Sequence, residues 1–182
     1  MSDVVVILGP AARLDALDAN AARAGLSRTA TQPRLHERAQ AAQWTAPGAS
    51  ALYVEDHLRG VRYLQGDPDP LARVLDGVEI VSRPALLARA AGDDLPARLA
   101  ALHALCALDG RAPGDDLAAH LDVLSRHPLL AARRAALRML SLGAGRALRE
   151  IVLRATEGEE DVALRGNWAA LLRVIDGGRG AA

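Results

Sequence analysis

The cluster Glu55-Asp56-His57 is the densest set of groups in the first half of the chain that could do acid–base chemistry. Two carboxylates beside an imidazole can serve as general acid and base when they converge on a pocket. The cluster lies between two runs of strand-forming residues, 51–54 and 61–64. The composition of residues 55–60 favours a solvated hairpin turn. The sequence leaves both a site and a plain turn open.

The histidines and the single cysteine lack the spacing of a metal site or a thiol nucleophile. No His-Glu-x-x-His pattern occurs, and Cys106 follows His103 by three residues without a second cysteine. The apolar run 102–108 around Cys106 predicts a buried, inert thiol. The junction Gly9-Pro10 lacks both glycine-rich phosphate-binding patterns. We therefore expect no catalytic residue, no metal and no cofactor.

Arginine is the residue type with the strongest case for binding. All 22 basic residues are arginine, and 22 acidic residues bring the formal net charge to zero. Between residues 126 and 154 arginines gather with few acids among them, and the partner-binding candidates there are Arg126, Arg134, Arg138 and Arg149. This block predicts a local basic surface, against the alternative of ordinary solvated arginines. Without a basic excess or an aromatic stacking platform, an acidic protein is favoured over nucleic acid.

The elements that would position these residues change character near residue 82. Before it, short β-type runs alternate with helical stretches. The expected strands are 4–8, 27–32, 51–54, 61–64 and 78–81, and the expected helices are 12–24, 34–43 and 70–75. This order predicts a small α/β domain over residues 1–82. A split βαβ, ferredoxin-like arrangement is compatible with it.

After residue 82 every segment has helical periodicity, and glycine, proline and aspartate mark the breaks. The expected helices are 84–91, 95–108, 115–126, 128–142, 145–156 and 160–175. They predict an all-α domain of about three helical hairpins over residues 83–176, followed by a disordered tail at 177–182. The whole chain is therefore expected to be α+β.

Three arginines recur in the same local pattern in the second half. Arg98, Arg133 and Arg165 each follow an apolar residue by three positions and precede a small or apolar pair. Their separations, 35 and 32 residues, match the period of helical-hairpin repeats. A hairpin of that length cannot bury its own apolar stripe, so neighbouring hairpins must stack. The pattern predicts an α-helical solenoid.

Over residues 83–176 the chain resembles the short bacterial HEAT-repeat family, in the form related to phycobilin-lyase-type repeats. The second helix of that repeat reads Asp-Val-Arg-x-x-Ala-Ala-x-Ala-Leu, and residues 161–171 are its closest copy here. The resemblance implies that the three arginines lie inside the stack, paired with acids at the inter-helix turns.

On this pattern Asp94 would serve Arg98 and Asp161 would serve Arg165, whereas the middle repeat carries His127-Pro128 instead of an acid. We therefore expect Arg133→Ala and Arg165→Ala to destabilise the protein more than Arg173→Ala, because an unpaired buried guanidinium is costly.

These observations favour a non-enzymatic protein–protein interaction, scaffold or adaptor module that binds its partner through the helical-repeat surface. Two alternatives stay open. One is a small-molecule or cofactor sensor with a pocket at the domain junction. The other, implied by the resemblance, is a lyase- or chaperone-type enzyme related to HEAT-like bilin lyases. The sequence has neither a signal-peptide pattern nor an apolar run of membrane-spanning length, so we expect a bacterial cytoplasmic protein without a membrane partner.

Overall fold

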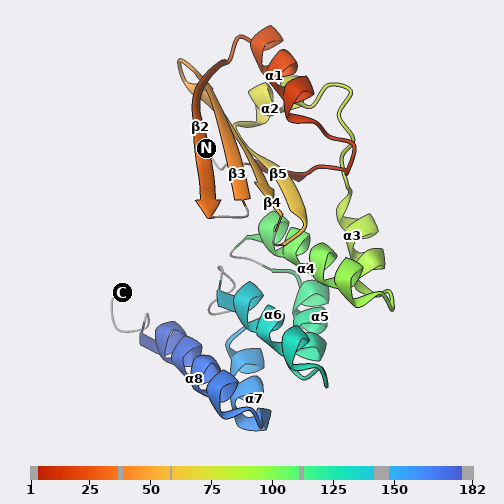
Figure 1. The fold of residues 1–182 in the computed structure, drawn as a ribbon, viewed down its shortest axis with the longest axis vertical. Helices are drawn as coiled ribbons and strands as arrows, with labels where there is room; N and C mark the ends of the chain where they lie inside the picture. Colours follow the sequence, from red (N-terminus) through yellow and green to blue (C-terminus); the bar gives the residue numbers. More distant parts are fainter. Residues whose placement is uncertain (1–3, 37–38, 58, 111–112, 142–147, 178–182) are drawn as a thin grey trace. The chain divides into compact units, whose positions relative to one another are not determined.

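A computed structural model describes residues 4–36, 39–57, 59–110, 113–141 and 148–177 (Figure 1). The chain divides into two compact units, Met1–Leu86 and Leu87–Ala182, close to the boundary predicted at residue 82. The first unit combines a sheet with helices, and the second is helical. The chain is α+β, as predicted.

The first unit is built on a five-stranded sheet in the order β1-β5-β4-β3-β2, with every pair antiparallel. Its strands are β1 (Val4–Ile7), β2 (Ser27–His36), β3 (Ala39–Ala46), β4 (Ala49–Asp56) and β5 (Val61–Gly66). The last four follow one another as a meander, and β1 lies beside β5. The ferredoxin-like expectation is wrong, because split βαβ units place parallel strands side by side and this sheet has none among its described strands.

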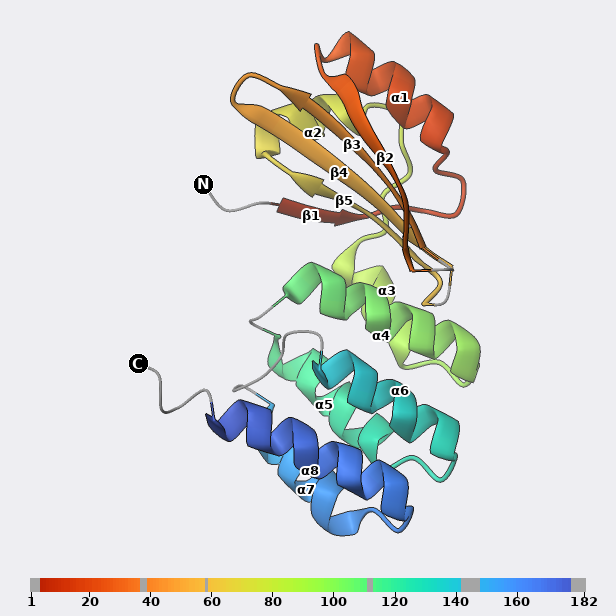
Figure 2. The same ribbon diagram turned by 60° about the vertical axis from the view of Figure 1, so that its left-hand side comes forward.

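Helices α1 (Leu14–Arg23) and α2 (Pro68–Val74) cover one face of this sheet (Figure 2). Strand alternation turns Trp44 and Tyr53 toward the helices, where both are fully buried with Leu17 of α1. The Asn20 amide of α1 donates two hydrogen bonds of 2.8 Å to carbonyl oxygens at the end of α2. The two helices are thereby fixed to each other as well as to the sheet.

Local patterns predicted some strands of this sheet and missed others. The pairing of runs 51–54 and 61–64 is confirmed, since Tyr53 lies opposite Leu64. The short helix expected at 34–43 is wrong, because β2 reaches His36 and β3 begins at Ala39. Alanine and glutamine have weak strand propensity, so pairing with β4 determines the structure there. The strand expected at 78–81 makes only one isolated bridge, from Ile80 to Leu8.

The second unit consists of helices that follow the predicted ranges closely. Helix α3 (Arg83–Ala90) crosses the boundary between the units, and the others are α4 (Leu95–Asp109), α5 (Asp115–Ser125), α6 (Leu130–Ser141), α7 (Arg149–Gly158) and α8 (Val162–Gly177). Residues 178–182 of the predicted tail lie outside the described residues.

The helices α5 to α8 form two neighbouring hairpins. Helix α5 packs on α6 and α7 packs on α8, while α5 also contacts α7 and α6 contacts α8 (Figure 1). Helix α4 contacts both α5 and α6. Small residues, including Ala132, Ala135 and Ala136, are buried along α6, which lets its neighbours approach closely. In the described part of the chain, none of the helices has the length and apolar character needed to span a membrane.

Candidate binding site

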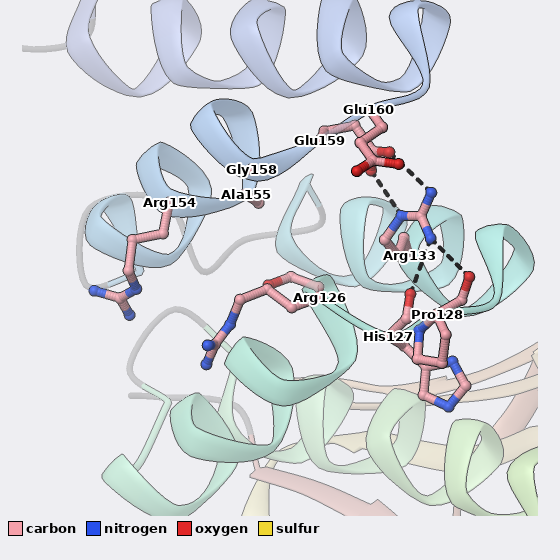
Figure 3. A pocket seen from close by; sticks show the side chains of 10 residues that line it. Arg126, His127, Pro128, Arg133, Arg154, Ala155, Gly158, Glu159 and Glu160 are labelled. Carbon is pink, nitrogen blue, oxygen red and sulfur yellow. Dashed lines mark hydrogen bonds and ion pairs between the residues drawn. The ribbon is translucent and has the colours of Figure 1, made fainter.

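A cleft of about 400 Å³ opens between the two hairpins, at the turn that joins the helices of each (Figure 3). We call it the hairpin cleft. Its lining from the α5–α6 hairpin is Ser125, Arg126, His127, Pro128 and Arg133, and its lining from the α7–α8 hairpin is Arg154, Ala155, Gly158, Glu159 and Glu160. The charged side chains make it a polar site, suited to a ligand with complementary charge.

A bidentate ion pair joins the hairpins at one end of the cleft. Arg133 donates from Nε and Nη2 to the two carboxylate oxygens of Glu159, at 2.8 and 2.9 Å. Its Nη1 donates to the backbone carbonyls of His127 and Pro128, at 2.9 and 3.0 Å. One guanidinium therefore ties together α6, the turn before it and the turn of the next hairpin.

The pair is largely withdrawn from water. The Glu159 side chain is 1% exposed and the Arg133 side chain is 18% exposed. Burial alone would raise the pKa of Glu159, but the hydrogen bonds from Arg133 and the Asp161 backbone, together with the positive charge of Arg133, hold that pKa below its ordinary value. The buried Trp168 indole also favours the charged carboxylate, although its Nε1 lies outside ordinary hydrogen-bond geometry. Glu159 is thus kept ionised and fixed.

The three recurrent arginines do not share one environment, which corrects the sequence prediction. Arg133 takes its acid from the following hairpin, not from its own. The Arg165 side chain is exposed on α8, after which the described chain has no further hairpin, and the Asp161 carboxylate accepts from the Leu164 backbone instead. The sequence prediction for Arg165→Ala is therefore wrong in its premise, and we expect this substitution to cost little stability.

Arg98 is partly buried, and its surroundings also depend on which residue the following hairpin supplies. Arg133 and Arg165 are 32 residues apart. The residue 32 positions before Glu159 is His127, which lies in the turn of the α5–α6 hairpin. Arg98 of α4 thus has no acid at the equivalent position of the next hairpin. Among the described residues its Nε is buried without a hydrogen-bond partner, and the expected pairing with Asp94 is not formed.

Two further arginines lie at the other end of the cleft. Arg126, at the end of α5, and Arg154, on α7, both bond the Asp122 carboxylate. Arg154 reaches Oδ1 from Nη2 at 3.0 Å and from Nε at 3.3 Å, while Arg126 Nη2 contacts Oδ2. The Arg126 side chain is 57% exposed and the Arg154 side chain is 50% exposed. We call Arg126 and Arg154 the arginine pair (Figure 3).

The other predicted partner-binding arginines lie elsewhere. Arg149 bonds both carboxylate oxygens of Asp176, at 2.7 and 3.0 Å, and so links the start of α7 to the end of α8. Its guanidinium is engaged within the unit, and it is not part of the cleft. Arg134 and Arg138 are exposed one turn apart on α6, and neither forms an ion pair with any described residue. Their role as binding residues stays a prediction.

The Glu55-Asp56-His57 cluster does not form a solvated turn. Glu55 and Asp56 are buried as the last residues of β4, because their pairing with Arg62 and Val61 extends the β4–β5 ladder. The turn itself begins at His57, whose side chain is exposed. The sequence interpretation missed this burial because nothing local marks where a strand ladder stops.

Glu55 is the centre of a hydrogen-bond network across three strands. Its carboxylate accepts from Gln40 on β3 at 2.8 Å, from the Tyr53 hydroxyl at 3.0 Å and from Arg62 Nε at 2.6 Å. Arg62 also donates to the Pro10 carbonyl, so the β1–α1 loop joins the network. Burial alone would raise the pKa of Glu55, but these donors hold it below the ordinary value.

This network joins three strands through one buried carboxylate. Burial and the Glu55 hydrogen bond raise the pKa of Tyr53, which keeps its hydroxyl protonated as a donor. His57 Nδ1 lies 3.6 Å from the Glu55 carboxylate, beyond ordinary hydrogen-bond distance. Gln40 and Tyr53 bond Oε2 of Glu55 and Arg62 bonds Oε1, so both carboxylate oxygens hold the strands together.

The remaining sequence candidates are the Cys106 thiol, which is partly buried, and the metal-binding side chains. Burial raises the pKa of Cys106 to about 12, so its thiol is not ionised at neutral pH. Within the ranges that the structure describes, no group of three or more His, Cys, Asp or Glu side chains could hold a metal ion.

Comparisons with protein-family models, with curated proteins and with solved structures find no match to this chain. The resemblance to HEAT repeats therefore stays an expectation from the sequence. The geometry defines the chain as an α+β protein with a charged cleft between two helical hairpins.

The lowered pKa values of Glu55 and Glu159 predict a stability that is lost in acid. Each carboxyl holds its proton less readily in the folded than in the unfolded state, so acid favours unfolding. The stabilisation is complete above the ordinary glutamate pKa of about 4.3 and disappears as the pH falls through the folded values. Thermal unfolding followed by circular dichroism should show a steady midpoint down to about pH 5 and a falling midpoint below it.

Glu159→Gln should make this fall shallower, because one of the two titrating groups is gone. A wild-type midpoint that rises below about pH 5 would contradict the assignment of both carboxylates as ionised in the folded protein.

Proposed function

We propose that this protein is a non-enzymatic protein-binding module whose helical unit is a short HEAT-like stack, and that the hairpin cleft receives a segment of its partner. The stack is supported by two neighbouring hairpins and by the Arg133–Glu159 pair between them. Partner binding is supported chiefly by the arginine pair, two exposed guanidinium groups held over one carboxylate beside an open cleft. The cytoplasmic location stays a prediction.

Binding is favoured over catalysis by the chemistry of the lining. Guanidinium groups remain protonated at all physiological pH values and cannot transfer protons. Glu159 is engaged by Arg133 and by the Asp161 backbone N–H, so it is not available as a base. His127 Nδ1 accepts a hydrogen bond of 3.1 Å from the Leu129 backbone. The charged side chains left to a ligand are the cations Arg126 and Arg154 at one end and the anion Glu160 at the other, an arrangement suited to electrostatic recognition.

Charge reversal tests the proposal. A tagged chain carrying Arg126→Glu and Arg154→Glu should lose a protein that co-purifies with the wild type from its source cell. The matched control is Arg134→Glu with Arg138→Glu, which makes the same change in net charge on the outer side of α6. We expect the control to retain the partner, as judged by quantitative mass spectrometry.

Loss of the partner from the α6 control, with retention by the cleft variant, would place binding on α6 and overturn the proposal. Circular dichroism melts of both variants separate loss of binding from loss of fold. We expect the α6 control to melt close to the wild type, because its arginines make no described ion pair. The cleft variant should melt at a lower temperature, because Asp122 loses both of its partners, so binding is compared at a temperature where both variants are folded.

A further inference from the structure

We infer that the arginine pair recognises a carboxylate-bearing peptide segment, and that Asp122 occupies the pair in the free protein as an internal competitor. This inference rests on the proposed function and specifies its ligand. Asp122 shows how the pair holds a carboxylate, since each arginine contacts a different oxygen of the same group. The partner's carboxylate would take over or share these donors.

The pair keeps binding capacity that Asp122 does not use. Two guanidinium charges face one carboxylate, which leaves one positive charge uncompensated at this end of the cleft. The Nη1 atoms of both arginines make no hydrogen bond with the residues that the structure describes. The two arginines come from different hairpins, so a carboxylate bound between them would contact both hairpins. A second acidic group would neutralise the site and satisfy these donors.

The surroundings favour a peptide over a polyanion such as RNA or a phosphate chain. Pro128 and Leu129, on the turn that follows Arg126, are exposed, and Leu129 is 55% exposed. Pro128 lines the cleft beside Arg133, so it offers apolar contact further along a bound segment than the acidic group at the arginine pair (Figure 3). Glu160 is exposed at the opposite end of the cleft, where it would repel a ligand carrying negative charge along its whole length. A short segment that is acidic at the arginine-pair end and apolar toward the Arg133 end fits this lining.

Fluorescence anisotropy with a defined probe tests this inference. The probe is a fluorescein-labelled Glu-Glu-Leu-Ala-Gly peptide, and its matched control carries Gln-Gln in place of Glu-Glu. We expect the acidic probe to bind the full chain and the control to bind at least about tenfold more weakly. Arg126→Ala and Arg154→Ala should each weaken binding about three- to tenfold.

Asp122→Asn provides the distinctive readout. It keeps the shape of the side chain but removes the competing charge, so the acidic probe should bind about three- to tenfold more tightly. A merely structural role for Asp122 would leave affinity unchanged or lower it. Thermal melts of Asp122→Asn check that its fold is retained.

Unchanged or weaker binding by Asp122→Asn overturns the competitor role. Equal binding of the acidic and glutamine probes, or tighter binding of inorganic pyrophosphate or oligouridylate than of the acidic peptide, overturns the ligand class. Either result can occur while charge reversal of the arginine pair still releases the co-purifying protein. The failure of this inference is therefore distinguishable from the failure of the proposed function.

Discussion

Replacing Arg133 by alanine is expected to lower the free energy of unfolding of the helical unit by about 3 kcal/mol, near the lower end for breaking a buried ion pair. The substitution leaves the almost fully buried Glu159 carboxylate without its counter-charge. It also removes the donors to the His127 and Pro128 carbonyls. The partial exposure of the Arg133 side chain keeps the loss from being larger.

Tryptophan fluorescence measures this loss unit by unit, because the chain has two tryptophans and each unit contains one. In a Trp44→Phe background, urea unfolding followed through the buried Trp168 reports the helical unit. Arg165→Ala and Arg173→Ala are the matched controls, and each should cost less than about 0.5 kcal/mol because their side chains are exposed.

The double variant Arg133→Ala/Glu159→Gln isolates the pairing itself. Neutralising Glu159 removes the unpaired buried charge, so the double variant should be more stable than Arg133→Ala alone. Strictly additive losses in this double-mutant cycle, or equal losses for all three arginines, would contradict the pair that joins the hairpins.

Replacing Glu55 by alanine is expected to destabilise the first unit by about 2–3 kcal/mol. The change leaves the Tyr53 hydroxyl, Gln40 and Arg62 without their common acceptor. Most of the cost comes from the fully buried Tyr53, because an unsatisfied buried donor is costly. Urea unfolding of a Trp168→Phe background, followed through Trp44, measures this unit alone.

Glu55→Gln should cost less than Glu55→Ala, because the amide oxygen still accepts hydrogen bonds. Asp76→Ala is the matched control, since Asp76 is an exposed acid of the same unit and its side chain makes no described hydrogen bond. An alanine variant no less stable than this control would show that the network does not hold the strands together.

The sequence predicts the helix bounds of the second unit well, because these depend on neighbouring residues. Helix α5 spans Asp115–Ser125 against the expected 115–126, and α4 spans Leu95–Asp109 against 95–108. Helical periodicity and the glycine, proline and aspartate breaks are properties of neighbouring residues, so one sequence reveals them. The paired strands at 51–54 and 61–64 were visible for the same reason.

Long-range pairing explains what the sequence did not reveal. The strand from Ala39 consists of alanine, glutamine and one tryptophan up to Trp44, and its pairing with β2 and β4 makes it a strand. Glu55 is buried because its ladder extends past the expected end of the hairpin strands. Neither feature has a local mark in the residue pattern.

The sequence predicts only some residues of the candidate site. Arg126 was singled out from the arginine-rich block, and Arg154 lies in the same block. The repeat pattern does not predict the acid that holds Arg133, because the pattern pairs each arginine with an acid of its own repeat and Glu159 belongs to the next one. Shifting the expected pairing by one repeat would have found it, since Glu159 follows Arg133 by 26 residues. Arg149 was misjudged because Asp176 lies far along the chain.

Site-specific photocrosslinking tests the central claim, that the hairpin cleft is where the partner binds. A benzophenone amino acid replaces Pro128, an exposed residue of the cleft, or Ala170, an exposed residue of α8, in separate chains. We predict that the co-purifying protein crosslinks from position 128 but not from position 170, and that charge reversal of the arginine pair abolishes the product. Crosslinking from position 170 alone, or equally from both positions, would contradict the account.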